Sequence, residues 1–205
     1  MGLLDRFRRA DADDASPYAD ASRDSAEEHN ASGLEMMRRG LIHEALEEFR
    51  RGLRSNPDSA EIYYNMGVAH DYLSETKRAA ECYERAVRLA PDFVEAYCGL
   101  GAAYSRLGKG LEAIKTCLQA IRLDPTYLDA HNGLALAYFH WGSYPEAAKA
   151  CGKALAIDPG YAQAHYTLGL IHVDLGERDK ALARYNIIKE SDPPLAEHLL
   201  RQIPR

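Results

Sequence analysis

The sequence repeats the same landmarks every 34 residues through most of its length. In the window 94–127, for example, Gly101 lies on one predicted helical face, Ala113 lies on a second, and Pro125 closes the unit. Four other windows of the same length carry their landmarks in the same register. The pattern therefore predicts two short helices, packed against each other, in every window. The five windows are residues 26–59, 60–93, 94–127, 128–161 and 162–195.

Each landmark has a physical role in such a helix pair. A small residue on the first helix lets the second helix approach closely, glycine at the end of the first helix favours a left-handed cap, and proline blocks continuation of the second helix. Ser74 replaces the capping glycine in the second window, so the turn there lacks the usual signal. The small residues are Gly33, Gly67, Gly101, Ala135 and Gly169; the capping glycines are Gly40, Gly108, Gly142 and Gly176; the prolines are Pro57, Pro91, Pro125, Pro159 and Pro193.

The order of landmarks, an aromatic residue, Leu-Gly, Tyr, Ala, Phe, Ala and Pro, resembles the tetratricopeptide repeat. The resemblance covers residues 26–195 and implies an all-α fold, a right-handed superhelical α-solenoid of antiparallel helix pairs. Residues 1–25 are then expected to form a flexible N-terminal tail, and residues 196–205 a C-terminal capping helix. The apolar residues expected to face the last repeat are Leu195, Leu199, Leu200 and Ile203.

Composition argues against several other classes of protein. The 205 residues carry a formal net charge of −6, whereas a general nucleic-acid binder needs a basic surface. No apolar run reaches the roughly 20 residues that span a bilayer, and the N-terminus has no secretory apolar core, so we expect a cytoplasmic protein. The cysteines form no C-x-x-C pair and are expected to be reduced thiols. They are Cys82, Cys98, Cys117 and Cys151.

The start of the chain allows two interpretations. Leu3, Leu4 and Phe7 could share a helix face beside three arginines, and an Asp/Ala/Ser tract follows them. A mobile tail is one interpretation. The other is a basic amphipathic segment, within residues 1–9, that contacts an anionic membrane or a partner. Such binding scales with buried apolar area, so three large apolar residues favour the mobile tail.

The sequence contains no motif that carries catalysis or binds a cofactor. A phosphate-binding glycine loop, H-E-x-x-H and G-x-S-x-G are all missing. The histidines His29, His131 and His165 fall at the first aromatic landmark, and His70 and His172 at the second, so they replace core aromatics. Metal ligands must converge, whereas these residues recur a full repeat apart. We therefore expect no enzyme activity, no cofactor and no metal.

The resemblance implies a concave face that is lined by the first helix of each pair and grips a peptide or a partner protein. Its middle row is wholly apolar, which suits an amphipathic helix or an extended apolar peptide. The alternative is that part of this row packs between repeats or against the cap. The rows are Asn30, Tyr64, Cys98, Asn132 and Tyr166; Leu34, Val68, Ala102, Leu136 and Leu170; Met37, Asp71, Ser105, Phe139 and Val173; Asn65 adds a polar group beside them.

Two ligand-binding patterns of the family are incomplete in this chain. The carboxylate clamp needs cations at offsets that here hold Asn30, Glu95 and Gly99, which argues against a C-terminal carboxylate ligand. The asparagine ladder is broken, because Asn30, Asn65 and Asn132 do not share one offset. The middle repeat has small residues on its first helix and is predicted to be the widest part of the groove.

A row of mostly acidic residues also repeats near the predicted rim of the groove. Each stands three residues after a potential N-terminal capping residue, which predicts a capping box at the start of the first helix. A ligand-binding role is the alternative, because the same carboxylates would favour a cationic partner. The row is Glu27, Glu61, Glu95, Asp129 and Gln163.

The sequence thus predicts a non-catalytic interaction scaffold or adaptor that binds a peptide or partner-protein segment in its concave groove. One alternative is a self-assembling structural protein whose terminus, for example the segment with Leu3, Leu4 and Phe7, occupies the groove of another copy. Another is a subunit that positions substrate for an enzyme encoded elsewhere. Function does not follow from fold, so the partner is not predicted.

Overall fold

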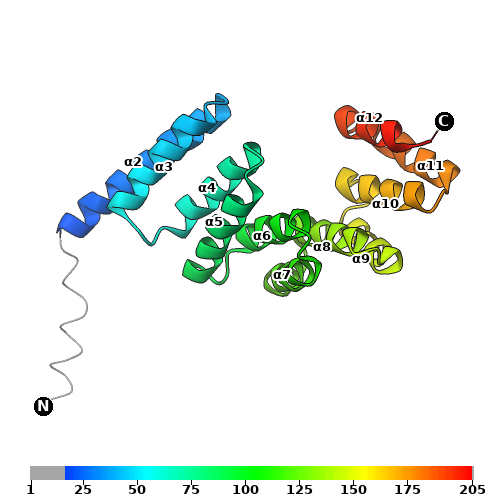
Figure 1. Cartoon of the computed structure of the whole chain (residues 1–205), viewed down its shortest axis with the longest axis horizontal. Helices are drawn as coiled ribbons and strands as arrows, with labels where there is room; N and C mark the ends of the chain where they lie inside the picture. The colour runs from blue at the N-terminus through cyan, green and yellow to red at the C-terminus, as the bar shows by residue number, and fades with distance from the viewer. Residues whose placement is uncertain (1–16, 205) are drawn as a thin grey trace, which may run out of the picture.

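The computed structural model describes residues 17–204, with side chains from residue 25 onward, as a stack of helix pairs (Figure 1). Helices are the only regular secondary structure in this part of the chain, which confirms the predicted all-α fold. The first helices are α2 (Pro17–Arg38), α4 (Ala60–Tyr72), α6 (Val94–Arg106), α8 (Leu128–His140) and α10 (Ala162–Asp174); the second helices are α3 (Ile42–Ser55), α5 (Thr76–Leu89), α7 (Gly110–Leu123), α9 (Tyr144–Ile157) and α11 (Arg178–Ile188).

The first helix begins earlier than the repeat pattern indicates. α2 starts at Pro17, so residues 17–25, which we expected in the flexible tail, are helical. Proline fits the first turn of a helix, and no glycine or further proline interrupts the sequence before Gly33. Residues 1–9, for which membrane contact was the alternative to a mobile tail, lie outside the described residues.

The turns inside the helix pairs follow the glycine signal. Gly40, Gly108, Gly142 and Gly176 have φ between 72 and 78°, as predicted for left-handed caps. Ser74 adopts the same conformation, with φ 58°, and its turn has the same hydrogen bonds: Ser74 N–H to Asp71 O at 2.9 Å and Glu75 N–H to His70 O at 2.9 Å. The missing glycine therefore leaves the turn intact but places a side chain in a conformation that disfavours it.

The stack is curved, with the first helices on the inside. Neighbouring first helices contact one another all along the array, whereas no two second helices do so within residues 17–204. Helices that are closer together lie on the inner side of an arc. Figure 1 shows the result, an array that bends so that α2 and α12 lie on the same side of α6 and α8.

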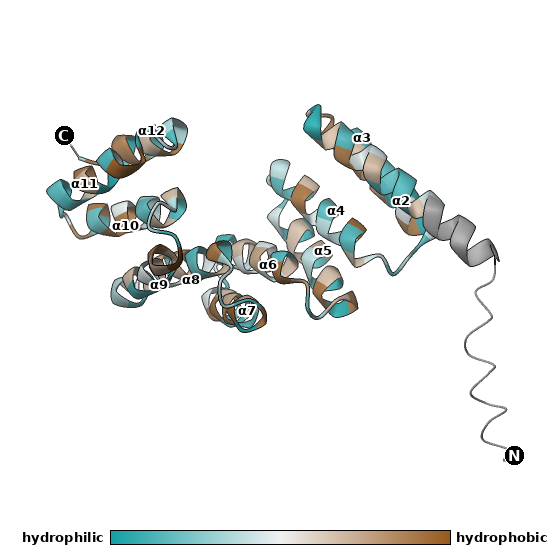
Figure 2. Ribbon diagram, turned by 180° about the vertical axis from the view of Figure 1, so that it is seen from behind, coloured by the Kyte–Doolittle hydropathy of each residue, from teal (hydrophilic) through white to brown (hydrophobic). Residues whose placement is uncertain are grey.

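Size complementarity holds each pair together. Phe49 and Tyr83, on second helices, are 0% and 2% exposed and face Gly33 and Gly67 on the first helices. Cys117 takes the corresponding place opposite Gly101. In Figure 2 hydrophobic and hydrophilic positions alternate along the helices, as expected for helices that bury one face.

The last helix, α12 (Pro193–Gln202), starts and ends about three residues before the predicted cap 196–205. The shift has a local cause, because the Asp192 side chain accepts a hydrogen bond from Leu195 N–H at 3.1 Å and Pro193 fills the first turn. Leu199 and Ile203 are buried as predicted, whereas Leu200 is 42% exposed and lines a hollow together with Leu182 of α11.

Candidate peptide-binding site

All sixteen residues predicted for the concave groove lie on the five first helices, which form the inner side of the arc. Asn30 and Asn65 are buried, and the other fourteen are half-buried. α2 carries Asn30, Leu34 and Met37; α4 carries Tyr64, Asn65, Val68 and Asp71; α6 carries Cys98, Ala102 and Ser105; α8 carries Asn132, Leu136 and Phe139; α10 carries Tyr166, Leu170 and Val173.

The two buried asparagines link the first two repeats to each other. Asn65 Nδ2 donates to Asn30 Oδ1 at 2.8 Å, and Asn30 Nδ2 donates to Glu61 Oε1 at 2.8 Å. Asn30 and Asn65 are each 7% exposed, so these amides bridge α2 and α4 rather than face a ligand. These two predicted groove residues therefore join neighbouring repeats.

Asp71 is also engaged within the protein. Its carboxylate accepts a hydrogen bond from the Tyr83 hydroxyl at 3.0 Å and pairs with Arg106 of the next repeat. Burial, and then the Asp71 carboxylate, raise the pKa of Tyr83. The negative charge at this end of the groove is therefore matched by a cation.

The cap covers the C-terminal end of the groove. Tyr166, Leu170 and Val173 pack against the cluster that contains Leu199 and Ile203. The Tyr166 hydroxyl and His198 Nδ1 share a hydrogen bond of 2.6 Å. These three predicted groove residues therefore contact α12.

On α6 and α8, Ser105 shares a hydrogen bond of 2.9 Å with His140 Nδ1 and Phe139 packs against a core cluster, but the other predicted groove residues are less engaged. Cys98, Ala102 and Leu136 are half-buried, and none of them belongs to the core clusters of the described residues. Asn132 Oδ1 accepts a hydrogen bond from the Thr167 hydroxyl at 2.9 Å, while its Nδ2 donates none within residues 25–204. This region therefore combines small or apolar side chains with an amide donor.

The capping explanation of the acidic row is wrong in the described structure. The N-terminal capping residue of α4 is Ser59, whose side chain accepts from Ile62 N–H at 3.3 Å, one residue later than predicted. α6 and α8 likewise begin one residue late and have no side-chain cap hydrogen bond. Glu61, Glu95 and Asp129 therefore sit at the second helical position, one short of the capping-box position. Glu27 lies inside α2.

Sequence reasoning missed a set of aromatic residues at these same helix starts. Phe93, Tyr127 and Tyr161 are the residues that directly precede α6, α8 and α10. The Phe93 ring lies 5.0 Å from that of Tyr64, and the Tyr161 hydroxyl donates to Asp129. Their recurrence at intervals of 34 was the available signal.

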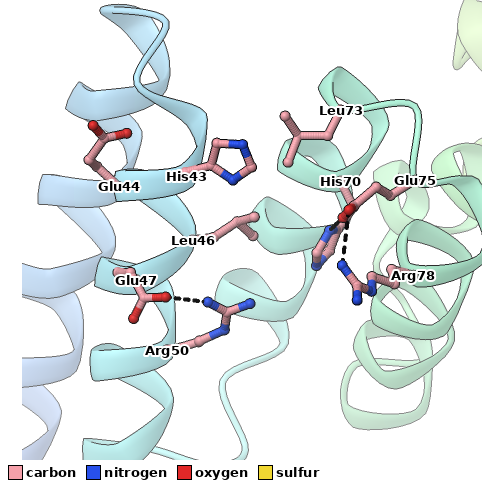
Figure 3. Close-up of a pocket in the computed structure, with 9 residues that line it drawn as sticks. All are labelled: His43, Glu44, Leu46, Glu47, Arg50, His70, Leu73, Glu75 and Arg78. Carbon is pink, nitrogen blue, oxygen red and sulfur yellow. Dashed lines mark hydrogen bonds and ion pairs between the residues drawn. The ribbon is translucent and has the colours of Figure 1, made fainter.

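Among the hollows outside the groove are two that α4 and α8 help to line. One, of about 260 Å³, lies between α3, α4 and α5 (Figure 3), and there Glu75 accepts hydrogen bonds from His70 Nδ1 at 2.7 Å and Arg78 at 2.9 Å. These hydrogen bonds, from His70 first, hold the pKa of Glu75 below its usual range. The other, of about 620 Å³, lies between α7 and α9, with Leu134 and Tyr138 of α8 in its lining. None of the predicted groove residues lines either hollow.

The histidines have structural partners. His131 Nε2 bonds to the Pro125 carbonyl at 2.8 Å, and His165 Nε2 to the Pro159 carbonyl at 2.9 Å. No cluster of His, Cys, Asp or Glu that could hold a metal ion occurs among the residues described. The described helices are also too short or too polar to cross a membrane.

The fold and the inner row of helices define a helical-repeat protein with an open concave surface. Models of the TPR or tetratricopeptide repeat match residues 33–71 and 72–108, residues 94–127, residues 116–149 and residues 141–203. The chain belongs to the tetratricopeptide-repeat family. Members of this family typically serve as non-catalytic scaffolds for protein interactions. No curated protein sequence matches the chain.

Solved structures show the same fold. MamA is 27% identical over 80% of this chain and 96% of its own, with a TM-score of 0.66. TTC0263, a thermophilic TPR protein in Thermus thermophilus, is 23% identical over 86% of this chain and 98% of its own, with a TM-score of 0.74. YrrB, described as a TPR protein with an unusual peptide-binding site, is 20% identical over 98% of both chains, with a TM-score of 0.61. At these identities the last two show the fold alone.

Proposed function

We propose that this protein is an interaction scaffold that binds an extended peptide or partner segment on its concave face, centred on α6 and α8. The observation that carries the proposal is the contrast along the groove. Asn30 and Asn65 bridge repeats at one end, and α12 covers the residues of α10 at the other. Between them, Ala102 and Leu136 remain half-buried and outside the core clusters.

The chemistry of this region suits a polypeptide ligand. Leu136 supplies apolar area and Asn132 Nδ2 supplies a donor, the pair of features that binds a side chain and a backbone carbonyl together. The small residue Ala102 leaves the backbone of α6 open to close approach. YrrB, which shares this fold, has a peptide-binding site, so the architecture is compatible with a peptide ligand.

Site-specific photocrosslinking tests the location. We would place a benzophenone amino acid at position 102 and, as the control, at Leu111, which is 55% exposed on α7 on the outer side. Partner adducts are expected from position 102, and Leu136→Asp should abolish them while helicity is unchanged. Leu136 is preferable to Leu170 for this purpose, because Leu170 packs against the cap and its substitution would disturb folding.

The result can also contradict the proposal. Equal adducts from positions 102 and 111, or adducts that persist in Leu136→Asp, would place the binding surface elsewhere. Leu111→Asp is the matched control for the added charge, and it should leave capture from position 102 unchanged.

A further inference from the structure

Six side chains of three consecutive repeats lie near one another in the middle of the concave face. We define the tyrosine niche as Tyr64, Glu95, Cys98, Tyr127, Asp129 and Tyr161. Tyr64 comes from α4, Glu95 and Cys98 are three residues apart on α6, Tyr127 and Asp129 start α8, and Tyr161 precedes α10. Cys98 is the small central residue, with larger side chains at the same offset in the repeats on both sides.

Two of the three aromatic side chains of the niche, Tyr64 and Tyr161, are held in place by contacts within the protein. The Tyr64 ring lies 5.0 Å from Phe93 and 5.8 Å from Tyr83. The Tyr161 hydroxyl donates to Asp129. All three tyrosines of the niche are half-buried, so each presents part of its ring to solvent. Because these contacts exist without a ligand, little side-chain ordering would be needed on binding.

The niche contains carboxylates but no cation. Glu95 and Asp129 are exposed, and neither forms an ion pair with another residue in the range 25–204. Asp129 accepts a hydrogen bond from a neutral hydroxyl, and Glu95 takes part in no hydrogen bond of the described residues. Asp71, by contrast, is paired with Arg106.

The electrostatic effects on neighbouring groups agree with this arrangement. Burial raises the pKa of Tyr127 to about 12, with further contributions from Asp129 and Glu95. The pKa of Cys98 is raised to about 12 by burial first, and by both carboxylates as well. No basic residue lowers either value. Tyr104, by contrast, has an arginine among the groups that act on its pKa.

We propose that the tyrosine niche receives the cationic side chain, arginine or lysine, of a peptide bound along the concave face. Aromatic faces attract a cation through their quadrupole, and the two unmatched carboxylates can form charge-assisted hydrogen bonds with it. The small Cys98 gives the side chain room between the rings. This inference rests on the proposed function, and it adds the charge class of the ligand.

A selection from a random peptide library displayed on phage tests the proposal even while the natural partner is unidentified. The target is the full chain, and the comparison is Glu95→Gln with Asp129→Asn, which removes both charges and keeps an acceptor for Tyr161. The matched control is Glu146→Gln with Asp179→Asn, two exposed carboxylates in the first turns of α9 and α11. Binders of the native chain and of the control should be enriched in Arg or Lys at one position, and binders of the niche variant should not.

A synthetic peptide from the selection then gives the magnitude. The niche variant should bind it about five- to thirtyfold more weakly, as expected for two partly exposed charge contacts, and the control variant within about twofold of the native chain. Replacing the enriched basic residue of the peptide by Gln should weaken binding to the native chain by a similar factor. It should leave the affinity for the niche variant almost unchanged.

The outcomes separate this inference from the proposed function. Suppose that Leu136→Asp abolishes binding, but that the binders show no enrichment in Arg or Lys, or that the niche variant selects the same enrichment. The niche is then not a cation site, and the groove proposal stands. If binders do not appear, or bind Leu136→Asp as well as the native chain, the groove proposal fails and the niche proposal fails with it.

Discussion

Tyr83 is fixed between glycines of two consecutive repeats, and this makes Gly67→Ala a sharp test of the packing argument. A Cβ at Gly67 would lie 2.6 Å from Tyr83 Cε1, and a Cβ at Gly99 would lie 2.7 Å from Cζ on the same ring. Tyr83 is 2% exposed, and its hydroxyl is hydrogen-bonded to Asp71 at 3.0 Å. The ring therefore has no free direction in which to move.

The expected cost follows from two opposing effects. Overpacking a filled core costs about 1–3 kcal/mol, and replacing glycine by alanine in a helix interior returns about 1 kcal/mol. Gly67→Ala should therefore destabilise the protein by up to about 2 kcal/mol. Gly101→Ala also brings a Cβ to 2.6 Å from a side-chain atom, Cys117 Sγ. The next repeat, however, has Ala135 and Cys151 at the same offsets, so this pair is tolerated and the change should be nearly neutral.

Urea unfolding and native-state hydrogen exchange of α4 and α5 would measure the difference. A double-mutant cycle tests the same point more directly. Gly67→Ala should reduce stability only slightly in a Tyr83→Cys background, because that combination reproduces the pairing of Ala135 with Cys151. Equal stabilities of Gly67→Ala and Gly101→Ala, or additive effects in the cycle, would refute the argument from the trapped ring.

Three further predictions concern a turn, the cap and acid stability. Ser74→Gly should stabilise the protein by about 0.5–1 kcal/mol because it removes a side chain from a left-handed position, and Gly108→Ser should destabilise it similarly, both measured by urea unfolding. Leu199→Ala, at a residue that is 0% exposed, should cost about 2–5 kcal/mol and speed hydrogen exchange in α11 before α6. The lowered pKa of Glu75 contributes stability above the ordinary carboxyl pKa, about 4.3, that is lost as pH falls through the lower folded value. Glu75→Gln should therefore flatten the loss of thermal stability below about pH 4.3, and an unchanged acid profile would contradict this.

The regular part of the fold could be predicted from the sequence because its signals are local. The small residue Gly67 and the capping glycine Gly108 each act within their own helix pair, and each pair resembles the next. The predictions failed at the two ends of the array, where the 34-residue pattern no longer applies. α2 continues back to Pro17 because nothing stops it, and α12 starts at Pro193 because Asp192 caps it.

The candidate site was harder to predict because its residues contact the neighbouring repeat. The offsets placed Asn65 on the inner face, but its burial depends on Asn30 in the previous repeat. The acidic row was assigned to capping because a shift of one residue in the helix start cannot be read from the sequence. That shift leaves Glu95 exposed and unpaired among the described residues, at the centre of the proposed cation site.

The contact of Tyr83 with both Gly67 and Gly99 also fixes the order in which the repeats can follow one another. A duplicated copy of the third repeat could be inserted after the second, because Gly99 would meet the ring again. The fifth repeat could not take that place, since it carries Thr167 at the offset of Gly99. The repeats thus share one consensus but are not interchangeable modules, and lengthening this array by recombination is permitted at some junctions and blocked at others.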